Sequence, residues 1–522
     1  MKRYHLITIA LACLAPASAR ADVKLPAIFS DHLVLQGGAA AAIWGWAEPG
    51  ETVTASIDDQ TKTAEADSAG HWTLKLGQLK AGAEPRTLTV KGRNTLTIRD
   101  VLVGEVWLCS GQSNMEMQVK GGMHGQVDRA DEEIAAANYP QIRMFVFQQT
   151  YNIYELPVTP DEPMSDRPGE WLVCSPETVA RFSAIGYFFG RDLHRELHSP
   201  VGLIHSSVGG TPIEAWTSIE AQRAEPELQP VLEAWRQKLA NFDPPRAQQD
   251  FLQAKATWLK QRAAAAASQQ PVPKAPPAFK NLRVEAPGGL FNAMIAPLVP
   301  YTIRGVIWYQ GERNADSRDG KFYGAQLKTL IHDWRARWGD EFYFAWVQLP
   351  GFGVAQRFPS EPTGWGVSVR DEMRKTLPVP RTGMAITIDL GGPTAGHPTN
   401  KADFAQRLSR LALHDVYQIT AAPWSGPLFQ SIKREGHEMV ITFDQATGLK
   451  SSADELRGFA IAGADQKFVW AKARIADDKV IVFSDTVPEP VAVRYDWASN
   501  PTGNLVNVAG LPASPFRTDD WN

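Results

Sequence analysis

Four groups of polar residues follow apolar runs in this sequence, and their chemistry suits ester hydrolysis. A serine hydroxyl is a poor nucleophile unless a neighbouring base removes its proton, and the oxyanion that forms needs hydrogen-bond donors aimed at one point. We expect Ser113 to be the nucleophile and His397, which follows the last group, to be the base. The groups are Gly111-Gln112-Ser113-Asn114, Ser206 to Thr211, Gln310 to Asn314 and Asp389 to Gly392, with His397-Pro398 just beyond.

The same places offer donors for the oxyanion. The backbone N–H groups of Ser113 and Gly210 are candidates, because glycine has no Cβ and lets the main chain approach a ligand closely. The side-chain amide of Asn314 is a third candidate. Each feature alone has a plainer interpretation, since a Gly-x-Ser after a strand is often a turn and an asparagine there is often a helix cap. Their occurrence together favours a catalytic site.

Six apolar runs must position these residues. Each is continuous rather than alternating, which is typical of parallel strands covered on both faces. Between them, residues 177–197 and 322–339 carry apolar side chains at spacings of three and four, which predicts amphipathic helices. Alternating strands and helices predict a doubly wound α/β domain over residues 101–415, with its ligand crevice at the carboxyl ends of the strands. The runs are VLVGEVWLCSG, QIRMFVFQQ, VGLIHSSVGG, IRGVIWYQG, FYFAWVQLPG and GMAITIDLGG.

Two β-rich parts flank this α/β domain. Residues 22–100 contain short β-type runs separated by Gly, Pro, Asn and Asp, which predicts a β-sandwich-like domain. Residues 416–522 return to short β-type runs and predict a second β-rich domain. Residues 219–284 interrupt the α/β domain with an Ala-, Gln- and Pro-rich segment, which predicts a helical insertion followed by a flexible connector.

Residues 1–21 have the features of a secretory signal peptide. Lys2 and Arg3 precede an apolar run from Leu6 to Leu14, and alanines at 17, 19 and 21 form an A-x-A cleavage pattern. We therefore expect a periplasmic or secreted protein. The apolar run is too short to span a bilayer, and no later segment approaches the roughly 20 apolar residues that a spanning helix needs, so no membrane anchor is expected.

The charge balance and the cysteines exclude several other classes of site. Lys and Arg number 53 against 57 Asp and Glu, a formal net charge of -4 without long like-charge runs, so nucleic acid is not an expected partner. Cys109 and Cys174 remain after processing and could form a disulfide or pack as two buried thiols. Neither lies in a C-x-x-C motif, which disfavours a metal or redox site. The oligomeric state is left open.

Four sequence blocks closely resemble the sialate O-acetylesterase group of SGNH hydrolases, carbohydrate esterases that remove acetyl groups from sugar hydroxyls. The resemblance spans roughly residues 25 to 415. It implies a flavodoxin-like SGNH hydrolase domain with a parallel sheet of about five strands, Ser113 as nucleophile, His397 as base, and no metal or organic cofactor. It also implies the block glycine and Asn314 as oxyanion donors, with Gln310 able to point into the same hole. The blocks are WLCSGQSNMEM, SSVGGTPIEAW, LFNAMIAPLVPYTIRGVIWYQGERNA and HPTNKADFAQRL.

One departure from the family pattern concerns the group that orients the histidine. The family usually has Asp-x-His-Pro in the last block, whereas this chain has Ala395-Gly396-His397-Pro398. The third member of a triad is therefore open. A Ser-His dyad, a backbone carbonyl, or a carboxylate from elsewhere could serve. Asp389 is the nearest carboxylate by sequence, and Glu312 and Asp403 are further candidates.

Residues for substrate binding are expected beside these motifs. Trp216 and Trp365 lie in predicted loops, where aromatic side chains often line a cleft. Arg313 could bind an acidic substrate. The run Lys401 to Arg410 has charges at helical spacing and predicts a solvated helix face without a functional role. The motifs do not distinguish acetylated sialic acid from plant cell-wall glycans such as xylan or xyloglucan.

Two other functions remain compatible with the sequence. One is an esterase of the same fold that acts on lipid or aryl esters. The other is a catalytically inactive glycan-binding protein, suggested by the missing aspartate before His397 and by the β-rich flanks. Retention of the other blocks argues against the inactive protein.

Overall fold

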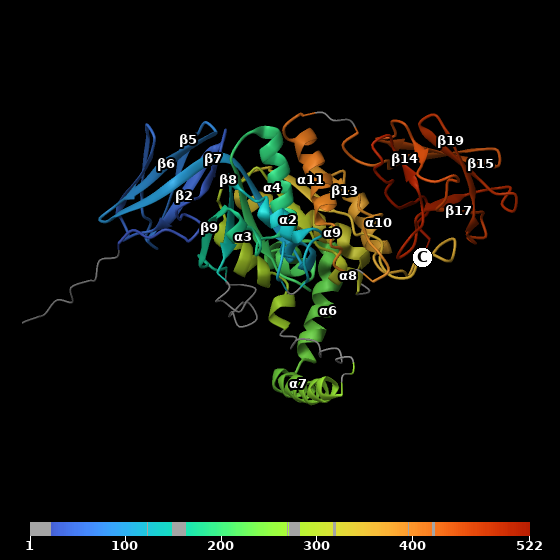
Figure 1. The fold of residues 1–522 in the computed structure, drawn as a ribbon, viewed down its shortest axis with the longest axis horizontal. Coiled ribbons are helices and arrows are strands. Elements are labelled where there is room, and N and C mark those ends of the chain that lie inside the picture. Colours follow the sequence, from blue (N-terminus) through green and yellow to red (C-terminus); the bar gives the residue numbers. More distant parts are fainter. Residues whose placement is uncertain are drawn as a thin grey trace, which may run out of the picture.

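Three parts follow one another along the longest axis of the computed structural model: a β-rich part, an α/β part and a second β-rich part (Figure 1). The expected signal peptide, residues 1–21, and most of the expected connector, residues 271–281, lie outside the described residues. The structure describes residues 22–122, 124–148, 163–268, 270, 282–316, 320–394, 396–419 and 423–521.

The α/β part is built on a mixed sheet in which the six predicted runs each form a parallel strand. The strand order is β13-β12-β11-β7-β10-β8-β9, and only β9 runs antiparallel to its neighbour. Counted in chain order, the five strands β7, β10, β11, β12 and β13 are arranged 2-1-3-4-5. The bounds are β7 (Thr95–Gly111), β8 (Tyr139–Phe147), β9 (Gly169–Cys174), β10 (Val201–Ser207), β11 (Gly305–Tyr309), β12 (Tyr343–Val347) and β13 (Thr382–Ala385).

Helices cover both faces of this sheet, which explains why its strands are continuously apolar. Neighbouring residues of a strand point to opposite faces. In β11, Trp308 contacts Trp334 of α9 at a ring distance of 5.9 Å, whereas Tyr309 stacks on Phe404 of α11 at 5.5 Å. The helices α9 and α11 therefore lie on opposite faces. The bounds are α4 (Ala184–Leu197), α9 (Tyr323–Trp338), α10 (Val367–Lys375) and α11 (Lys401–Asp415), with short helices α2 (Ala130–Ala135) and α3 (Pro176–Val179).

Strand β7 joins the N-terminal part to the central sheet. Its first half pairs antiparallel with β6, and its second half pairs parallel with β10 and β11. The expected boundary near residue 100 falls inside this strand, and the buried apolar residues of both parts form one continuous cluster. The N-terminal strands are β1 (Val34–Gln36), β2 (Ala40–Trp46), β3 (Thr52–Ile57), β4 (Gln60–Glu65), β5 (His71–Gln78) and β6 (Gly82–Lys91).

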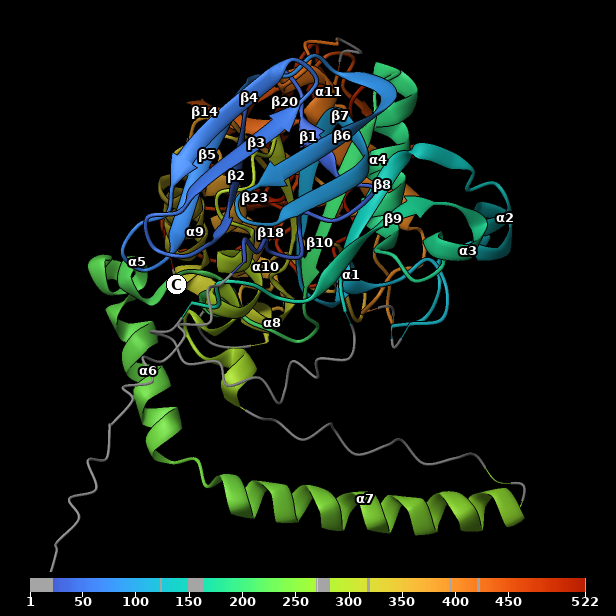
Figure 2. The same cartoon turned by 90° about the vertical axis from the view of Figure 1, so that its left-hand side faces the viewer.

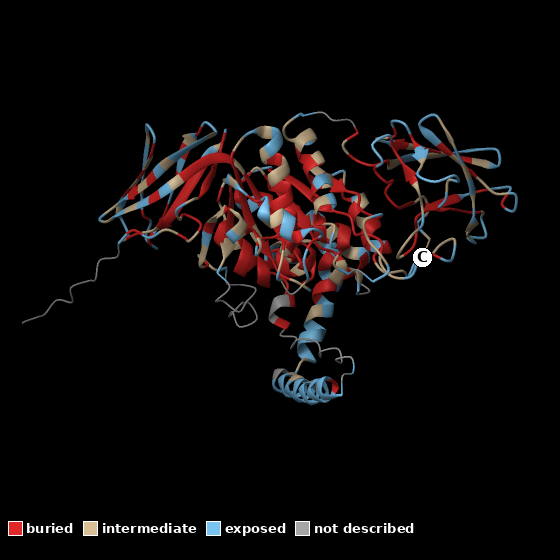
Figure 3. Cartoon of the chain, viewed as in Figure 1, coloured by how far each residue is buried: buried red, intermediate tan, exposed pale blue. Residues whose placement is uncertain are grey.

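Three helices follow β10 in the chain and lead away from the α/β part. They are α5 (Ile219–Ala224), α6 (Gln229–Ala240) and α7 (Pro244–Ala267). Figures 1 and 2 show α7 lying apart from the rest of the chain, and Figure 3 shows that it is exposed along most of its length. This part of the insertion is helical, as the composition of the segment predicts.

The C-terminal part has its own buried cluster and two four-stranded sheets. Arg370 of α10, which is 1% exposed, ties it to the α/β part. Its guanidinium donates to the carbonyl oxygens of Ala498 and Ser499 at 2.7 and 2.6 Å and to that of Leu349 at 3.0 Å. The strands are β14 (Leu428–Glu435), β15 (Glu438–Asp444), β16 (Lys450–Ser451), β17 (Phe459–Ala462), β18 (Val469–Trp470), β19 (Lys472–Ala476), β20 (Lys479–Phe483), β21 (Ala492–Tyr495), β22 (Leu505–Val506) and β23 (Phe516–Arg517).

Two open points concern the cysteines and the membrane. Cys109 and Cys174 are both buried and form no disulfide, so the structure agrees with the interpretation of two buried thiols. Among the described residues, none of the helices combines the length and the apolar composition needed to cross a bilayer.

Candidate active site

The carboxyl ends of three neighbouring strands coincide at one edge of the central sheet. Gly111 at the end of β7 lies opposite Ser207 of β10 on one side and Tyr309 of β11 on the other. Gly111 has a φ of 142°, and a Cβ there would lie 2.1 Å from the Tyr309 carbonyl oxygen, so only glycine fits. The chain turns abruptly after Gly111 and places Gln112 and Ser113 at this edge.

Two main-chain donors beside the turn have no acceptor among the described residues. Ser113 is the first residue of the short helix α1 (Ser113–Glu116) and is 7% exposed. First-turn N–H groups have no partner inside a helix, and that of Ser113 finds no acceptor elsewhere in the described chain. The Gly210 N–H likewise has none there, and its φ of 73° favours glycine. Both groups are free to bind an oxyanion.

His397 lies half-buried on the loop before α11, and this loop is tied to α1. The Asn114 side-chain amide donates to the Gly396 carbonyl oxygen at 3.1 Å. The His397 ring makes no hydrogen bond to Ser113 or to another described residue, and catalytic hydrogen bonds are often loose before substrate binds. The geometry therefore brings the loop of the predicted base to the helix of the predicted nucleophile without an existing hydrogen bond between them.

The surroundings of His397 keep its ring neutral. Burial lowers the pKa of His397 to about 4, and the nearby His124 and Lys401 add to the effect, while Glu116 opposes it. A neutral imidazole is the form that a general base requires.

A carboxylate-imidazole pair that the sequence analysis missed lies against His397. The rings of His124 and His397 are 4.6 Å apart, tilted by 40°. Glu116 Oε2 accepts hydrogen bonds from His124 Nε2 at 3.1 Å and from the Gly209 N–H at 2.7 Å. A Cβ on Gly209 would lie 2.8 Å from that oxygen, which explains the glycine. Glu116 stands in the first sequence block, but nothing in the sequence pairs it with a histidine.

The three carboxylates considered as orienting acids have other surroundings. Asp389 makes two hydrogen bonds to the Arg407 guanidinium, at 2.5 and 2.7 Å, and is not hydrogen-bonded to His397. Asp403 is exposed on α11. Glu312, at the start of α8 (Glu312–Ala315), accepts from Asn114 Nδ2 at 2.5 Å.

Asp389→Asn is therefore expected to leave kcat/KM for an acetyl ester close to the wild-type value. The Asp389 side chain is 42% exposed, and an ion pair of this kind contributes only about 0–1 kcal/mol to stability. A loss of several orders of magnitude, as for a triad carboxylate, would contradict this expectation.

Lys401 is fully buried, so the expectation of a solvated helix face is wrong at this position. Its Nζ donates to Asn114 Oδ1 at 2.6 Å and lies 5.6 and 5.2 Å from the ring centroids of Tyr309 and Phe404. Burial lowers the pKa of Lys401 to about 7, although Glu312 opposes the shift, and burial raises the pKa of Glu312. The lysine and the glutamate thus hold the two ends of the Asn114 amide beside Ser113.

Lys401→Met is expected to lower both stability and turnover. It leaves the buried Asn114 oxygen without its donor, which costs about 1–3 kcal/mol. Movement of α1 by about 1 Å would lower kcat up to a hundredfold. Thermal unfolding and kcat on p-nitrophenyl acetate measure the two effects, with the exposed Lys479→Met as the matched control. Unchanged values for both variants would refute the role.

Two predicted oxyanion donors face the interior instead. Gln310, which is 0% exposed, donates to Gln112 Oε1 at 3.1 Å and to Asn314 Oδ1 at 2.8 Å. Asn314, 1% exposed, donates to Glu214 Oε2 at 3.1 Å. Their amides support the loops around the site, because each is held by several partners at once.

Gln112 is a donor that the sequence analysis did not single out. Its Oε1 accepts from Gln310 Nε2 and from the Arg313 N–H at 3.3 Å, which fixes the orientation of the amide. The Nε2 group has no acceptor in the described part of the chain. Gln112 directly precedes Ser113, and this adjacency is the only sequence signal for it.

Comparison with known proteins decides the family. The sequence model for "Carbohydrate esterase, sialic acid-specific acetylesterase" matches residues 103–240 and 286–403. A solved structure of a carbohydrate acetylesterase from Xanthomonas citri is 35% identical, with a TM-score of 0.76, and the match covers 96% of this chain and 100% of that chain.

The chain belongs to this family of carbohydrate esterases. Curated sialate O-acetylesterases are similar over nearly their whole length: that of Mus musculus is 28% identical, covering 97% of each chain, and that of Homo sapiens is 26% identical, covering 98% of this chain and 95% of that one. The esterase is therefore a carboxylic ester hydrolase, and the predicted family resemblance is confirmed.

The predicted substrate-binding residues of the esterase differ in their surroundings. Trp216 is 0% exposed, so the expectation that it lines the cleft is wrong. It is the last residue of the 3-10 turn Ile213–Trp216, and its Nε1 donates to Oγ1 of the preceding Thr211 at 3.0 Å. Trp365 is half-buried and donates to Asp316 Oδ1 at 2.9 Å. The Arg313 guanidinium pairs with Glu285 at 3.0 Å, which offsets its charge.

A second serine-histidine pair lies near Ser113 in the esterase. Ser207 Oγ and His205 Nε2 are 2.6 Å apart on β10, and burial lowers the pKa of His205 to about 4. Since residues two apart on a strand share a face, this pair follows from the strand itself.

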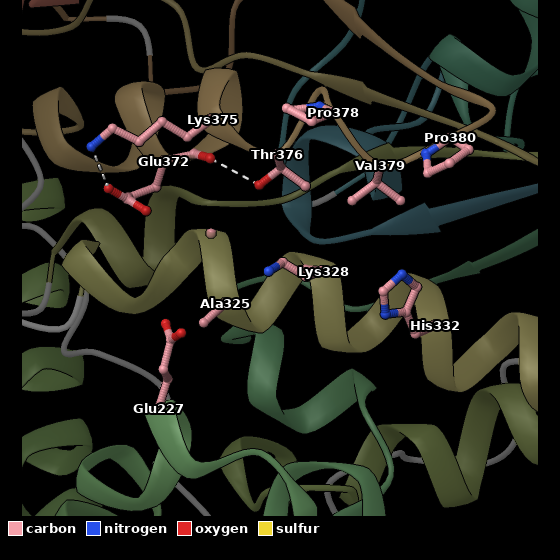
Figure 4. A pocket seen from close by; sticks show the side chains of 11 residues that line it. Glu227, Ala325, Lys328, His332, Glu372, Lys375, Thr376, Pro378, Val379 and Pro380 are labelled. Carbon is pink, nitrogen blue, oxygen red and sulfur yellow. Dashed lines mark hydrogen bonds and ion pairs between the residues drawn. The ribbon is translucent and has the colours of Figure 1, made fainter.

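Two further observations concern other kinds of site in the esterase. Within the described ranges, no group of three or more His, Cys, Asp or Glu side chains could hold a metal ion. A hollow of about 470 Å³ between α9 and α10 is lined by residues such as Lys328, His332 and Lys375, and its Glu372 pairs with Lys375 (Figure 4). It contains none of the predicted site residues.

Proposed function

We propose that the chain is a secreted O-acetylesterase of sugar hydroxyls that forms an acetyl-enzyme on Ser113. The observation that carries the proposal is the pair of N–H groups of Ser113 and Gly210, neither of which has an acceptor in the described ranges, beside a loop that bears the neutral His397. The family assignment supports the reaction class, because the matched family and the solved relative are named for acetylester hydrolysis.

The proposed reaction has two halves. His397 removes the Ser113 proton as the hydroxyl attacks the acetyl carbonyl, and the oxyanion accepts hydrogen bonds from the Ser113 and Gly210 N–H groups. His397 then gives the proton to the departing sugar oxygen. In the second half His397 activates water, which attacks the acetyl-enzyme, and acetate leaves from the regenerated serine.

We assign the third oxyanion donor to Gln112 Nε2 in place of the Asn314 and Gln310 amides, which have partners inside the protein. Its orientation is fixed before substrate binds, as electrostatic stabilisation of a transition state requires.

Gln112→Glu tests this donor. The substitution keeps an oxygen for the Gln310 and Arg313 donors but replaces the amide with an oxygen that repels an oxyanion. We expect kcat to fall by at least about 10²–10³, the usual cost of one oxyanion donor, and the thermal stability to fall as well, because Gln112 is 3% exposed and the new carboxylate is buried. Wild-type turnover in this variant would remove Gln112 from the mechanism.

The proposed catalytic domain is a flavodoxin-like SGNH hydrolase domain covering about residues 101–415. The 2-1-3-4-5 order of five of its six parallel strands, with β8 added outside β10, supports it, since that is the flavodoxin-like order. The site lies at the carboxyl edge where β7 is flanked by β10 and β11, the switch point at which such sheets bind ligands.

Acetate release identifies the substrate class. The panel contains acetylated sialosides, acetylated xylan, acetylated xyloglucan and p-nitrophenyl acetate. We expect release from at least one glycan; activity on the aryl ester alone would replace the proposal with a general esterase, and binding of glycan without any release would indicate an inactive protein. N-terminal sequencing of the exported protein tests cleavage near Ala21.

A further inference from the structure

A preformed hollow lies between the α/β part and the C-terminal β-rich part. Its volume is about 420 Å³, within the range of small-molecule sites. Two prolines complete its wall, and the residues that define it are Phe358, Ser360, Gln466, Phe468, Arg494 and Trp521. We call it the junction pocket.

The loop on one side of the junction pocket is held firmly to the C-terminal part. The N–H groups of Phe352, Gln356 and Glu361 donate to carbonyl oxygens of residues 499, 500 and 497 at 3.0, 2.8 and 2.8 Å. Arg494 Nη1 also donates to Ser360 Oγ at 2.8 Å. Such a pocket exists before its ligand arrives, which reduces the entropic cost of binding.

One aromatic ring of this pocket is largely exposed to solvent and two are half-buried, and the Arg494 guanidinium lies 4.2 Å from the centroid of one of these, Phe468. Phe358 is 65% exposed although Gln356 Nε2 holds its carbonyl oxygen at 2.9 Å. The rings of Phe468 and Trp521 are 5.9 Å apart on the opposite wall. Beside them, the exposed Gln466 offers an amide and Ser360 a hydroxyl. Apolar ring faces next to uncharged hydrogen-bonding groups match a sugar ring, which has C–H faces and a hydroxyl rim.

The ion pair at the pocket favours an uncharged sugar over an acidic one. Arg494 is the one cation among the residues that line the pocket. Its Nε and Nη2 groups donate to the two carboxylate oxygens of Asp519 at 2.9 and 2.6 Å. Its side chain is 4% exposed. The charge of this guanidinium is offset by Asp519 and the group is buried, so it offers little attraction to the carboxylate of an acidic sugar.

We propose that the junction pocket binds an uncharged sugar residue of the glycan chain, away from the acetyl group that is hydrolysed. The proposal rests on the proposed carbohydrate substrate. The same loop carries Trp365, which contacts Asp316 directly after α8, so the loop runs from the pocket to the helix that holds Asn114.

Phe358→Ala is the decisive variant, with Val354→Ala as its matched control. Val354 is 66% exposed on the same loop but does not line the pocket. On acetylated xylan or xyloglucan, Phe358→Ala should raise KM by roughly threefold to tenfold, the range that one aromatic contact supplies, with kcat unchanged. Val354→Ala should match wild type, Phe358→Trp should restore KM, and neither kcat nor KM for p-nitrophenyl acetate should change.

The possible outcomes separate this proposal from the proposed function. Equal KM values for Phe358→Ala and wild type on both polymers would overturn the pocket, as would an equal loss on p-nitrophenyl acetate. If neither polymer releases acetate, affinity electrophoresis of Ser113→Ala with deacetylated xylan and xyloglucan still decides: retardation that Phe358→Ala abolishes supports the pocket, and its absence overturns it. A larger effect on an acetylated sialoside than on the neutral polymers would overturn the choice of an uncharged sugar.

Discussion

Ser113→Ala is expected to lower kcat for acetate release by about 10⁶, the loss seen when a serine nucleophile is removed from a hydrolase. The residual rate would come from the main-chain donors and substrate binding, because both survive the substitution. Ser113 is the first residue of α1, and its side chain makes no structural hydrogen bond in the described chain, so the fold should be retained. Circular dichroism and thermal unfolding check this.

Ser207→Ala is the matched control for this variant. Ser207 is as buried as Ser113, at 7% exposure, and already has a histidine partner at 2.6 Å. We expect the kcat of Ser207→Ala to be within about tenfold of the wild-type value. Diisopropyl fluorophosphate should label the peptide that contains Ser113. Loss of activity and of labelling in Ser207→Ala, with both retained in Ser113→Ala, would move the nucleophile to β10.

His397→Asn is expected to reduce kcat by a comparable factor of about 10⁶, since serine and base act as one unit. The pH dependence of kcat/KM in the wild-type enzyme should also show that the His397 ring is neutral. The pKa of His397 is lowered to about 4, so the base form persists as pH falls through 6.5. The value of kcat/KM should decline only as the pH approaches 4, because protonation below that pH removes the base.

His124→Gln separates the base from its neighbour. The His124 charge helps to lower the pKa of His397, so its removal should move the acid limb of kcat/KM toward higher pH while kcat at neutral pH stays far above that of His397→Asn. The reverse pattern, with the large loss in His124→Gln, would make His124 the base.

The strands, and the strand ends that carry the candidate reacting groups, could be predicted from the sequence because they depend on local pattern. The six apolar runs predict parallel strands by their continuity, and all six are parallel in the sheet. The polar residues that end β7, β10 and β11 then meet at one edge, since the carboxyl ends of parallel strands coincide. The four sequence blocks, taken together and in order, also sufficed to predict the family.

The direction of each side chain and the choice of its partner came only from the tertiary structure. Lys401 and Asn114 are 287 positions apart, and the charge pattern of a helix does not tell which charge turns inward. Trp216 is in a turn but folds against the sheet, and Asp389 has Arg407 for a partner rather than His397. Asn314 follows a strand end as expected, yet its amide binds Glu214. Sequence thus determined which elements form and which chemistry they carry, whereas burial and hydrogen bonding between distant segments decided which side chains reach the site.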